Sequence, residues 1–286
     1  MTQHDCMKSP FSKLPLSDKM FKKFSQFIYS NLGIHLTPTK KVMLQARLTR
    51  RLRNLNLSSF EEYYEYVTSD EGLKNEMPNM VNAVTTNKTD FFRESKHFKY
   101  LTDIILPEFY EYEKNRKFKI WSAACSTGAE PYTMAMLLKE FALNNAGFRF
   151  AILSTDISTE VLNIAKNGIY QYEMAQNIPN AFRKKYLLKT KDIVKHPYIR
   201  IVPELKQLIK FKQLNLMDEY YPVVTDIDVI FCRNVFIYFD RQTQERVIRR
   251  LCSHLRPGGY LFIGHSETMR IQNPPFTCVS STIFRK

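Results

Sequence analysis

The sequence predicts an α/β protein: a parallel sheet with helices on both faces, preceded by a small all-α domain and interrupted by a small β-rich insertion. Three observations predict this fold. Before residue 117 the apolar residues recur only at helical spacing, whereas after it short apolar runs alternate with helical stretches. A segment rich in Lys, Tyr and Pro interrupts the alternation at residues 171–206. At about 150 residues per domain, a length of 286 residues agrees with two domains.

Residues 17–86 are expected to form the all-α domain, after a flexible polar tail at residues 1–16. Ser17 can cap a first helix that ends at Gly33. A second helix is expected from about Thr39 to Asn54, with one apolar stripe made of Leu44, Leu48, Leu52 and Leu55. Two shorter helices are expected at Phe60–Thr68 and Met77–Val84.

Residues 87–286 are expected to form the sheet domain. The expected strands are Phe118–Trp121, Phe150–Ser154, Leu208–Phe211, Ile227–Cys232 and Tyr260–Gly264, followed by one or two strands within Phe276–Arg285. The expected helices between them are Pro131–Leu143, Thr159–Asn167 and Gln242–Leu255. Within the insertion, Tyr198–Val202 resembles a strand.

Composition excludes several classes of protein. Hydrophobic residues make up 44% and charged residues 24%, which excludes global disorder. No apolar run reaches the ~18 residues of a membrane span, and the first residues lack the apolar segment of a secretory signal. Five widely spaced cysteines without a CxxC pair argue for reduced thiols in a cytosol, and against a zinc site or a disulfide framework.

The net charge of +14 favours a polyanionic partner. Nucleic acid, an anionic membrane surface and an acidic protein all remain open, because composition does not distinguish among them.

The turn after the first expected strand reads Ala-Ala-Cys-Ser-Thr-Gly-Ala-Glu-Pro-Tyr (123–132). Small residues there let a ligand approach the backbone closely, but no GxGxxG motif supports a dinucleotide. Glu130 would repel a phosphate and suits a cofactor that carries a cation. An ordinary tight strand–helix turn is an equally good interpretation.

Asp156 ends the second expected strand, where an acidic residue can accept hydrogen bonds from ribose hydroxyls. It could also be the N-cap of the next helix. Taken together, Gly128, Glu130 and Asp156 suggest a nucleoside ligand with a positive group, and S-adenosylmethionine has that chemistry.

The fourth expected strand delivers Arg233 and Asn234 at its carboxyl end, with Tyr238 close behind. An Arg-Asn pair is also a common helix start with a surface cation. The adjacent residues His265, Ser266 and Glu267 cannot converge as a catalytic triad and are expected to pack a loop. The segment that joins the two domains contains Phe91 and Phe92, which we expect to be core anchors and not base-stacking platforms.

The motifs TTNKTDFFRE, SAACSTGAEPY, STDIS, FCRNVFIYFD and LRPGGYLFIGHSE, in this order, resemble the chemotaxis-receptor glutamate methyltransferases, the CheR family. The resemblance covers nearly the whole chain. It implies a Rossmann-like, S-adenosylmethionine-dependent methyltransferase sheet behind a small all-α domain. It also implies methyl transfer to glutamates on the cytoplasmic helices of chemoreceptors for chemotactic adaptation, with S-adenosylhomocysteine as product. A cytoplasmic monomer is expected, with no metal, no nucleic-acid partner and no membrane insertion.

Roles carry over from the family position by position. Arg93 and Tyr238 match residues that place the substrate, and Arg93 also belongs to the interdomain motif at the cofactor. The implied cofactor-binding set is Asn87, Thr89, Arg93, Glu130, Asp156, Asn215, Leu216, Arg233 and Asn234. Because a glutamate carboxylate is already ionised at neutral pH, in-line displacement needs no general base.

Two departures from the family pattern stand out. Ala129 replaces the first acid of the usual GEEPY, while Glu130 retains the second, so cofactor binding is expected to survive. Members that tether to a receptor's C-terminal pentapeptide carry a glycine-rich loop in the insertion. The segment Lys189–Arg200 contains no glycine, which argues against pentapeptide tethering here.

The second expected helix is strongly basic and carries no acid. We expect its cations to face outward and to dock acidic receptor helices; the proposed docking set is Lys40, Arg47, Arg50, Arg51 and Arg53. A solvated charged face is the alternative.

Two other functions compete with this one. A nucleic-acid methyltransferase would suit the charge, but the sequence after the fourth strand reads Arg-Asn-Val-Phe instead of the (Asp/Asn/Ser)-Pro-Pro-(Tyr/Phe) motif that grips a flipped base. A non-catalytic adaptor that binds S-adenosylmethionine is the second, since a fold alone does not establish turnover. Retention of Arg93, Arg233 and Tyr238 together argues against the adaptor.

Overall fold

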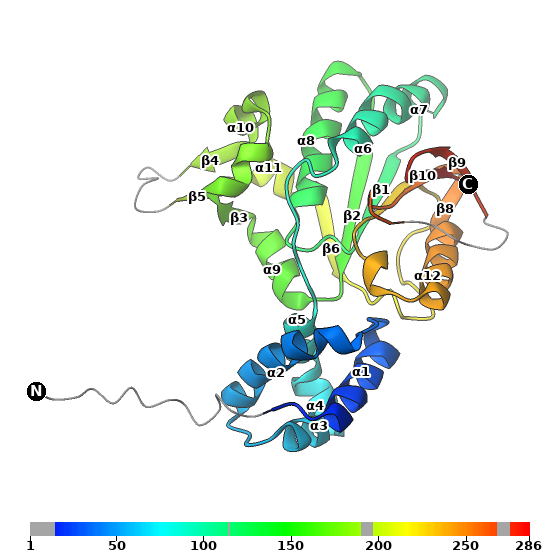
Figure 1. Cartoon of the computed structure of the whole chain (residues 1–286). Coiled ribbons are helices and arrows are strands. Elements are labelled where there is room, and N and C mark those ends of the chain that lie inside the picture. The colour runs from blue at the N-terminus through cyan, green and yellow to red at the C-terminus, as the bar shows by residue number, and fades with distance from the viewer. Residues whose placement is uncertain (1–14, 114, 190–196, 268–274) are drawn as a thin grey trace, which may run out of the picture. The chain divides into compact units, whose positions relative to one another are not determined.

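A computed structural model describes residues 15–113, 115–189, 197–267 and 275–286, and the chain divides into two compact units between Thr86 and Asn87 (Figure 1). No helix in these described ranges is long and apolar enough to cross a membrane.

The first unit is all-α. Its helices are α1 (Asp18–Leu32), the short η2 (Pro38–Lys40), α2 (Lys41–Leu55), α3 (Phe60–Thr68), α4 (Asp70–Asn75) and α5 (Met77–Val84). The Ser17 side chain caps α1 by accepting a hydrogen bond from the Met20 amide, and Gly33 ends the helix at φ 69°. Helix α4 was not predicted, because its six residues DEGLKN carry no apolar periodicity. The predicted tail, residues 1–16, lies outside the described residues except for its last two, of which Leu16 is buried.

The cations of α2 do not all face outward, contrary to the sequence prediction. Arg51 donates two hydrogen bonds of 2.8 Å to Glu76, which is 1% exposed and also accepts one from the Tyr63 hydroxyl. Arg47 donates to the carbonyl oxygens of Val84 and Thr85. These two arginines hold the all-α unit together. The exposed cations are Lys40, Arg50 and Arg53. In the predicted apolar stripe, the first three leucines are buried and Leu55 is half-buried.

The second unit is built on a seven-stranded sheet in the order β6-β2-β1-β7-β8-β10-β9. Its strands are β1 (Phe118–Ala123), β2 (Phe150–Asp156), β6 (Ile209–Gln213), β7 (Ile227–Cys232), β8 (Leu255–Phe262), β9 (Thr277–Ser280) and β10 (Ile283–Arg285). The five strands from β6 to β8 pair in parallel, and β10 pairs antiparallel with both β8 and β9. The helices are α6 (Ser95–Tyr100), the π-helical η3 (Leu101–Ile105), α7 (Leu106–Glu113), α8 (Ala129–Asn144), α9 (Thr159–Asn167), the short η5 (Phe236–Tyr238) and α12 (Arg241–His254).

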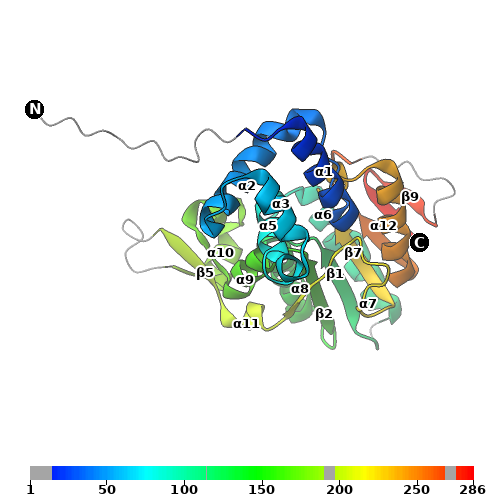
Figure 2. The same ribbon diagram turned by 90° about the horizontal axis from the view of Figure 1, so that it is seen from below.

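Alternating strand residues serve two cores, one on each face of the sheet. Ile120, Val229 and Phe262 pack with α6, α7 and α8, whereas Trp121 and Ile230 pack with α12. Helices α8 and α12 accordingly flank the strands in Figure 2. Phe91 is 1% exposed in the first core and Phe92 packs against it, so the prediction that both are core anchors is confirmed.

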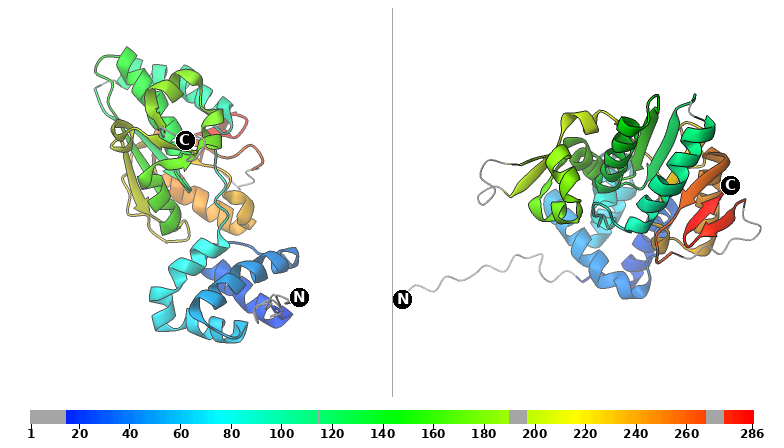
Figure 3. Two further views of the ribbon diagram at one scale, coloured as in Figure 1. Left: turned by 90° about the vertical axis from the view of Figure 1, so that its left-hand side faces the viewer. Right: turned by 90° about the horizontal axis from the view of Figure 1, so that it is seen from above.

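The insertion forms a separate antiparallel sheet, in the order β3-β5-β4, beside the β6 edge of the large sheet (Figure 3). Its elements are β3 (Ile169–Gln171), η4 (Tyr172–Asn177), α10 (Asn180–Tyr186), β4 (Leu187–Lys189), β5 (Tyr198–Ile201) and α11 (Pro203–Lys206). The predicted strand is present, and helices fill more of the insertion than we expected. Residues 190–196, the centre of the glycine-free segment, lie outside the described residues.

Candidate functional site

The strand order reverses direction between β1 and β7, which are neighbours at the centre of the sheet. From β1 the chain continues to β2 and β6 on one side, and later returns to β7 and β8 on the other. Ligands of open α/β sheets bind at such a reversal, outside the carboxyl ends of the strands. The two loops that leave these strands begin at Ala124 and Arg233, which are the positions that the sequence motifs single out.

Unusual backbone conformations gather near this edge. Eight non-glycine residues in the described ranges have a positive φ. Five of them lie in the segment before α6 or in the two loops: Phe92, Glu94, Ala124, Ser126 and Asn234. Each such residue costs of order 1 kcal/mol and persists only where its surroundings enforce it. Their clustering makes this edge the candidate functional site.

A buried ion pair joins the two loops. Glu130, in the first turn of α8, accepts a 2.7 Å hydrogen bond from Nε of Arg233 and a 2.6 Å hydrogen bond from the Ser122 hydroxyl. The helix N-terminus favours a carboxylate at this position. The Arg233 side chain is only 3% exposed, so the sequence alternative of a surface cation at a helix start is excluded.

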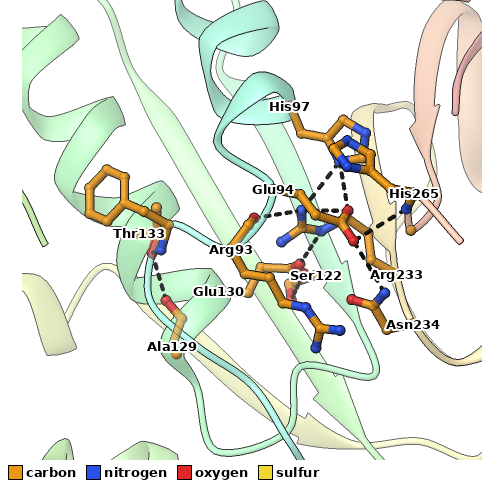
Figure 4. A network of polar contacts seen from close by, with 12 residues as sticks. Arg93, Glu94, His97, Ser122, Ala129, Glu130, Thr133, Arg233, Asn234 and His265 are labelled. Atoms are coloured by element: carbon orange, nitrogen blue, oxygen red, sulfur yellow. Dashed lines mark hydrogen bonds and ion pairs between the residues drawn. The ribbon is translucent and has the colours of Figure 1, made fainter. Parts of the chain in front are cut away.

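The other side of Arg233 contacts α6 and the segment before it (Figure 4). Its Nη1 donates to the Arg93 carbonyl oxygen at 2.8 Å, and to Oε2 of Glu94 and Nδ1 of His97 at 3.2 Å each. The guanidinium also lies over the rings of Phe98 and Phe231. Within the described residues, Nη2 is the guanidinium nitrogen that donates to no protein group.

Glu94 and His97 are electrostatically distinct. Burial alone would raise the pKa of Glu94, but the charge of Arg233 and hydrogen bonds from the His265 amide and Asn234 outweigh it, so the pKa is lowered. Burial and the nearby Arg233 charge lower the pKa of His97 to about 3, so its imidazole is neutral at neutral pH. Because Nδ1 faces an Arg233 donor, Nε2 carries the proton and donates to the Thr282 hydroxyl at 2.8 Å.

Glu94, His97 and His265 bring potential metal-ligand atoms within 4.8 Å of one another. However, Nη1 of Arg233 already donates to both Glu94 and His97. The guanidinium therefore holds the place that a metal ion would take, and a second cation there would be repelled.

Asp156 organises the loop after β1. Its two carboxylate oxygens accept from the amides of Ser126 at 2.8 Å and Ser158 at 3.0 Å. Burial raises the pKa of Asp156, although backbone hydrogen bonds act in the opposite direction. The N-cap of α9 is Ser158, so Asp156 does not have the capping role considered as an alternative. Ile157 also donates a backbone hydrogen bond to this carboxylate, so three of its roughly four acceptor sites are used and about one remains for a ligand.

The other predicted residues differ in how firmly they are held. Asn87 accepts a 2.8 Å hydrogen bond from the Ser126 hydroxyl through its carbonyl oxygen, and Asn215 accepts from the Met217 amide through its side chain. Leu216 is 7% exposed, and Thr89 is half-buried.

The two residues predicted to be catalytic keep polar groups available. The Arg93 guanidinium has one hydrogen bond in the described residues, to the Lys88 carbonyl oxygen, and the half-buried Tyr238 hydroxyl has none.

The structure therefore brings the Arg93 carbonyl oxygen and the side chains of Glu130, Arg233 and Asn234 into one network, while Asn87 and Asp156 contact the loop after β1 beside it. Sequence reasoning missed Glu94 and His97. Glu94 directly follows Arg93 in the recognised motif, and His97 lies three residues further on; that proximity was the available signal. Glu267 accepts from the amides of Asn234, Phe236 and Gly264, which confirms the expected loop packing.

Residues 87–285 match the family described as CheR methyltransferase, SAM binding domain, and residues 19–85 match CheR methyltransferase, all-alpha domain. The chain belongs to the CheR methyltransferase family. Three relatives are similar over most of their length. The chemotaxis protein methyltransferase of Borreliella burgdorferi is 41% identical over 249 residues, which are 86% of this chain and 86% of the relative. That of Escherichia coli is 38% identical over 95% of this chain and 92% of the relative. Chemotaxis protein methyltransferase 2 of Pseudomonas aeruginosa is 38% identical over 92% and 91%.

This CheR-family chain is thus a methyltransferase with S-adenosylmethionine as cofactor, and the resemblance stated from the motifs is confirmed. The residues at the carboxyl edge fit that cofactor. Nη2 of Arg233 remains for an anionic group, Glu130 supplies a carboxylate for a cationic one, and Asp156 retains acceptor capacity for hydroxyls.

Gly128 provides a test of the loop in this CheR-family site. It has φ +93°, and an added Cβ would lie 2.8 Å from Cβ of Ala165 and 3.1 Å from the Tyr170 hydroxyl. We expect Gly128→Ala to displace the loop and to weaken S-adenosylhomocysteine binding about tenfold in a calorimetric titration.

Gly147→Ala is the matched control, because Gly147 also has a positive φ (+83°) but an added Cβ would meet nothing within 4 Å. Equal affinities in the two variants would show that the steric fit at Gly128 does not shape the site.

Proposed function

We propose that this protein transfers the methyl group of S-adenosylmethionine to glutamate side chains on the cytoplasmic helices of chemoreceptors, forming methyl esters for chemotactic adaptation. The main supporting observation is the contrast between its two site arginines. Arg233 is buried and fixed by two carboxylates, as a cofactor-holding group should be, whereas Arg93 keeps most of its guanidinium available for a substrate carboxylate. The relatives' name, chemotaxis protein methyltransferase, supports the same function.

The cofactor would be held at both ends by fixed groups. Glu130 would bind its α-ammonium group and Arg233 its α-carboxylate, while Asp156 would accept from the ribose hydroxyls. Asn215 and Leu216 would line the adenine pocket, and Asn87, Thr89, Arg93 and Asn234 would complete the site. When bound, the cofactor supplies an electrophilic methyl group on a sulfonium.

The protein's own contribution to the reaction is placement. A glutamate carboxylate, with an ordinary pKa of about 4.3, is ionised at neutral pH and needs no base. Arg93 and Tyr238 would orient that carboxylate for in-line attack, and removing water from the carboxylate would make it more reactive. The reaction requires no general base. A buried, neutral His97 that does not act as a base is therefore compatible with this chemistry.

The competing functions lead to different products. A nucleic-acid methyltransferase would label DNA or RNA nitrogen atoms, and an adaptor would bind the cofactor without turnover. Incubating the protein with S-adenosylmethionine and a receptor cytoplasmic fragment distinguishes them: we expect peptides that contain glutamate to gain one methyl group by mass spectrometry. Methylated nucleic acid and unmodified receptor would contradict the proposal.

We further propose that the protein acts in the cytoplasm as a monomer, on an acidic helical receptor domain, without a pentapeptide tether. The glycine-free segment Lys189–Arg200 supports the last point.

Receptor docking is proposed for the exposed cations of α2 and of η2, which directly precedes it. Lys40, Arg50 and Arg53 remain candidates, since all three are exposed. Arg47 and Arg51 serve the internal contacts of the all-α unit, so replacing them would confuse docking with stability. Loss of Arg51 would leave the Glu76 carboxylate buried without its main partner.

We expect the double variant Arg50→Glu/Arg53→Glu to raise KM for receptor about tenfold at low salt, with little change in kcat. The physical reason is that exposed charges act mainly on encounter and docking, which salt screens. Steady-state kinetics at two ionic strengths measure this effect.

The matched control is Lys19→Glu/Lys22→Glu, which makes the same charge change on exposed positions of α1. Equal increases of KM in both double variants would mean that net charge, and not α2, attracts the receptor.

A further inference from the structure

We propose that Glu94 and His97 are positioning residues, which hold Arg233 so that its Nη2 faces the carboxylate of the cofactor's amino-acid part. This inference rests on the proposed role of Arg233 in cofactor binding. Neither residue would touch the cofactor; each would act through the guanidinium.

The guanidinium donors of Arg233 point in fixed directions. Nε is committed to Glu130, and Nη1 is shared among the Arg93 carbonyl oxygen, Glu94 and His97. These bonds fix the plane of the guanidinium, and Nη2 is the nitrogen that has no acceptor among the described residues. The guanidinium group is planar and rigid, so fixing two of its nitrogens also sets the direction of the third.

Glu94 links three separate segments at this point (Figure 4). Its Oε2 accepts from Arg233, while its Oε1 accepts from the Asn234 side chain and the His265 amide at 3.2 Å each. Its own backbone is left-handed, with φ 58°. The Glu94 carboxylate therefore positions the ends of β7 and β8 relative to the segment before α6.

His97 completes this arrangement as a neutral acceptor. It is 1% exposed, and the Thr282 hydroxyl fixes its ring from the other side. The charged groups near it are Arg233 and Glu94, with His265 in edge contact at a centroid distance of 4.6 Å. A protonated imidazole would repel the guanidinium, whereas the neutral ring offers Nδ1 as an acceptor.

A merely structural role makes a different prediction. If these side chains only fill the core, their replacement lowers stability and weakens every ligand of the site alike. If they position Arg233, the loss is confined to ligands that carry the amino-acid carboxylate. S-Adenosylhomocysteine carries that group, and 5′-methylthioadenosine has the same nucleoside without it.

The experiment measures the affinity of the full-length protein for both compounds by calorimetric titration, with melting temperatures recorded in parallel. We expect Glu94→Gln to weaken S-adenosylhomocysteine at least about tenfold and methylthioadenosine less than about twofold. The control on α6 is Lys96→Gln, an exposed position outside the network, for which we expect no change.

Two variants of His97 keep the test decisive even if Glu94→Gln does not fold. Asparagine places an amide oxygen near the Nδ1 position, whereas glutamine reaches toward the Nε2 position. We therefore expect His97→Asn to retain S-adenosylhomocysteine binding and His97→Gln to lose about tenfold, with methylthioadenosine binding retained in both.

Equal losses for the two compounds, or equal affinities of His97→Asn and His97→Gln for S-adenosylhomocysteine, would overturn the positioning role and leave the proposed function intact. A wild-type protein that binds S-adenosylhomocysteine no better than methylthioadenosine would overturn the proposed role of Arg233 itself, and the positioning role with it.

Discussion

Replacing Arg233 with alanine is expected to abolish methyl transfer and to lower the free energy of unfolding of the 87–286 unit by about 3–5 kcal/mol. The arginine is the partner of two carboxylates with little exposure, Glu130 at 9% and Glu94 at 11% of the side chain. Without it, two negative charges remain buried next to each other. Urea unfolding monitored by the fluorescence of Trp121, which is fully buried in this unit, measures the loss.

The pH dependence of this effect has a definite sign. The folded pKa of Glu94 lies below its ordinary value, chiefly because the charge of Arg233 and hydrogen bonds outweigh burial. Its contribution to stability is therefore present above the ordinary glutamate pKa of about 4.3, and is lost as the pH falls through the folded pKa. The alanine variant lacks this contribution, so its deficit relative to wild type should shrink on acidification.

Arg241→Ala is the control, because Arg241 is an exposed arginine at the start of α12. We expect it to unfold like wild type at every pH. A deficit of the Arg233 variant that stays constant between neutral pH and pH ~3.5 would contradict the proposed charge balance.

Replacing Tyr238 with phenylalanine is expected to lower kcat about 10–100-fold and to leave S-adenosylhomocysteine affinity within about twofold. The hydroxyl makes no hydrogen bond within the described residues, so its removal leaves no protein group unpaired. The loss should therefore appear where the substrate carboxylate is oriented. Turnover at saturating receptor and a calorimetric titration separate the two effects.

Tyr220→Phe serves as the matched control, because Tyr220 is 74% exposed. A loss of cofactor affinity as large as the loss of kcat in Tyr238→Phe would mean that Tyr238 belongs to the cofactor site instead.

Much of the fold could be predicted because local signals agree with it. The Ser17 cap, the Gly33 stop and the helical spacing between them define α1, and strand β7 was predicted with its observed bounds. Strand β8 shows where such signals fail. It begins at Leu255, five residues before the predicted start. The sequence prediction began too late because Pro257, Gly258 and Gly259 indicate a turn. In the structure this stretch pairs with β7 through a register shift, and Gly259 allows the Ile227 carbonyl oxygen to approach closely.

The site was less predictable because its key contacts are non-local. Motif positions indicated Arg233 and Glu130, but no periodicity could show that Glu94, 139 residues earlier, shares the same guanidinium. The same limitation applies to α2. The sequence places Arg50 and Arg51 side by side as equal cations, whereas only the fold shows that Glu76 holds one of them. Sequence patterns predict which face a residue occupies, and tertiary pairing decides whether its charge is available.

Glutamate methylation is tested with S-adenosylmethionine labelled in its methyl group, with chemoreceptor-containing membranes as acceptor and mild alkali afterwards. We expect label in the receptor band that alkali releases as volatile methanol, which identifies a carboxyl methyl ester. Alkali-stable label, or no label from a protein that binds the cofactor, would contradict the proposed glutamate methylation.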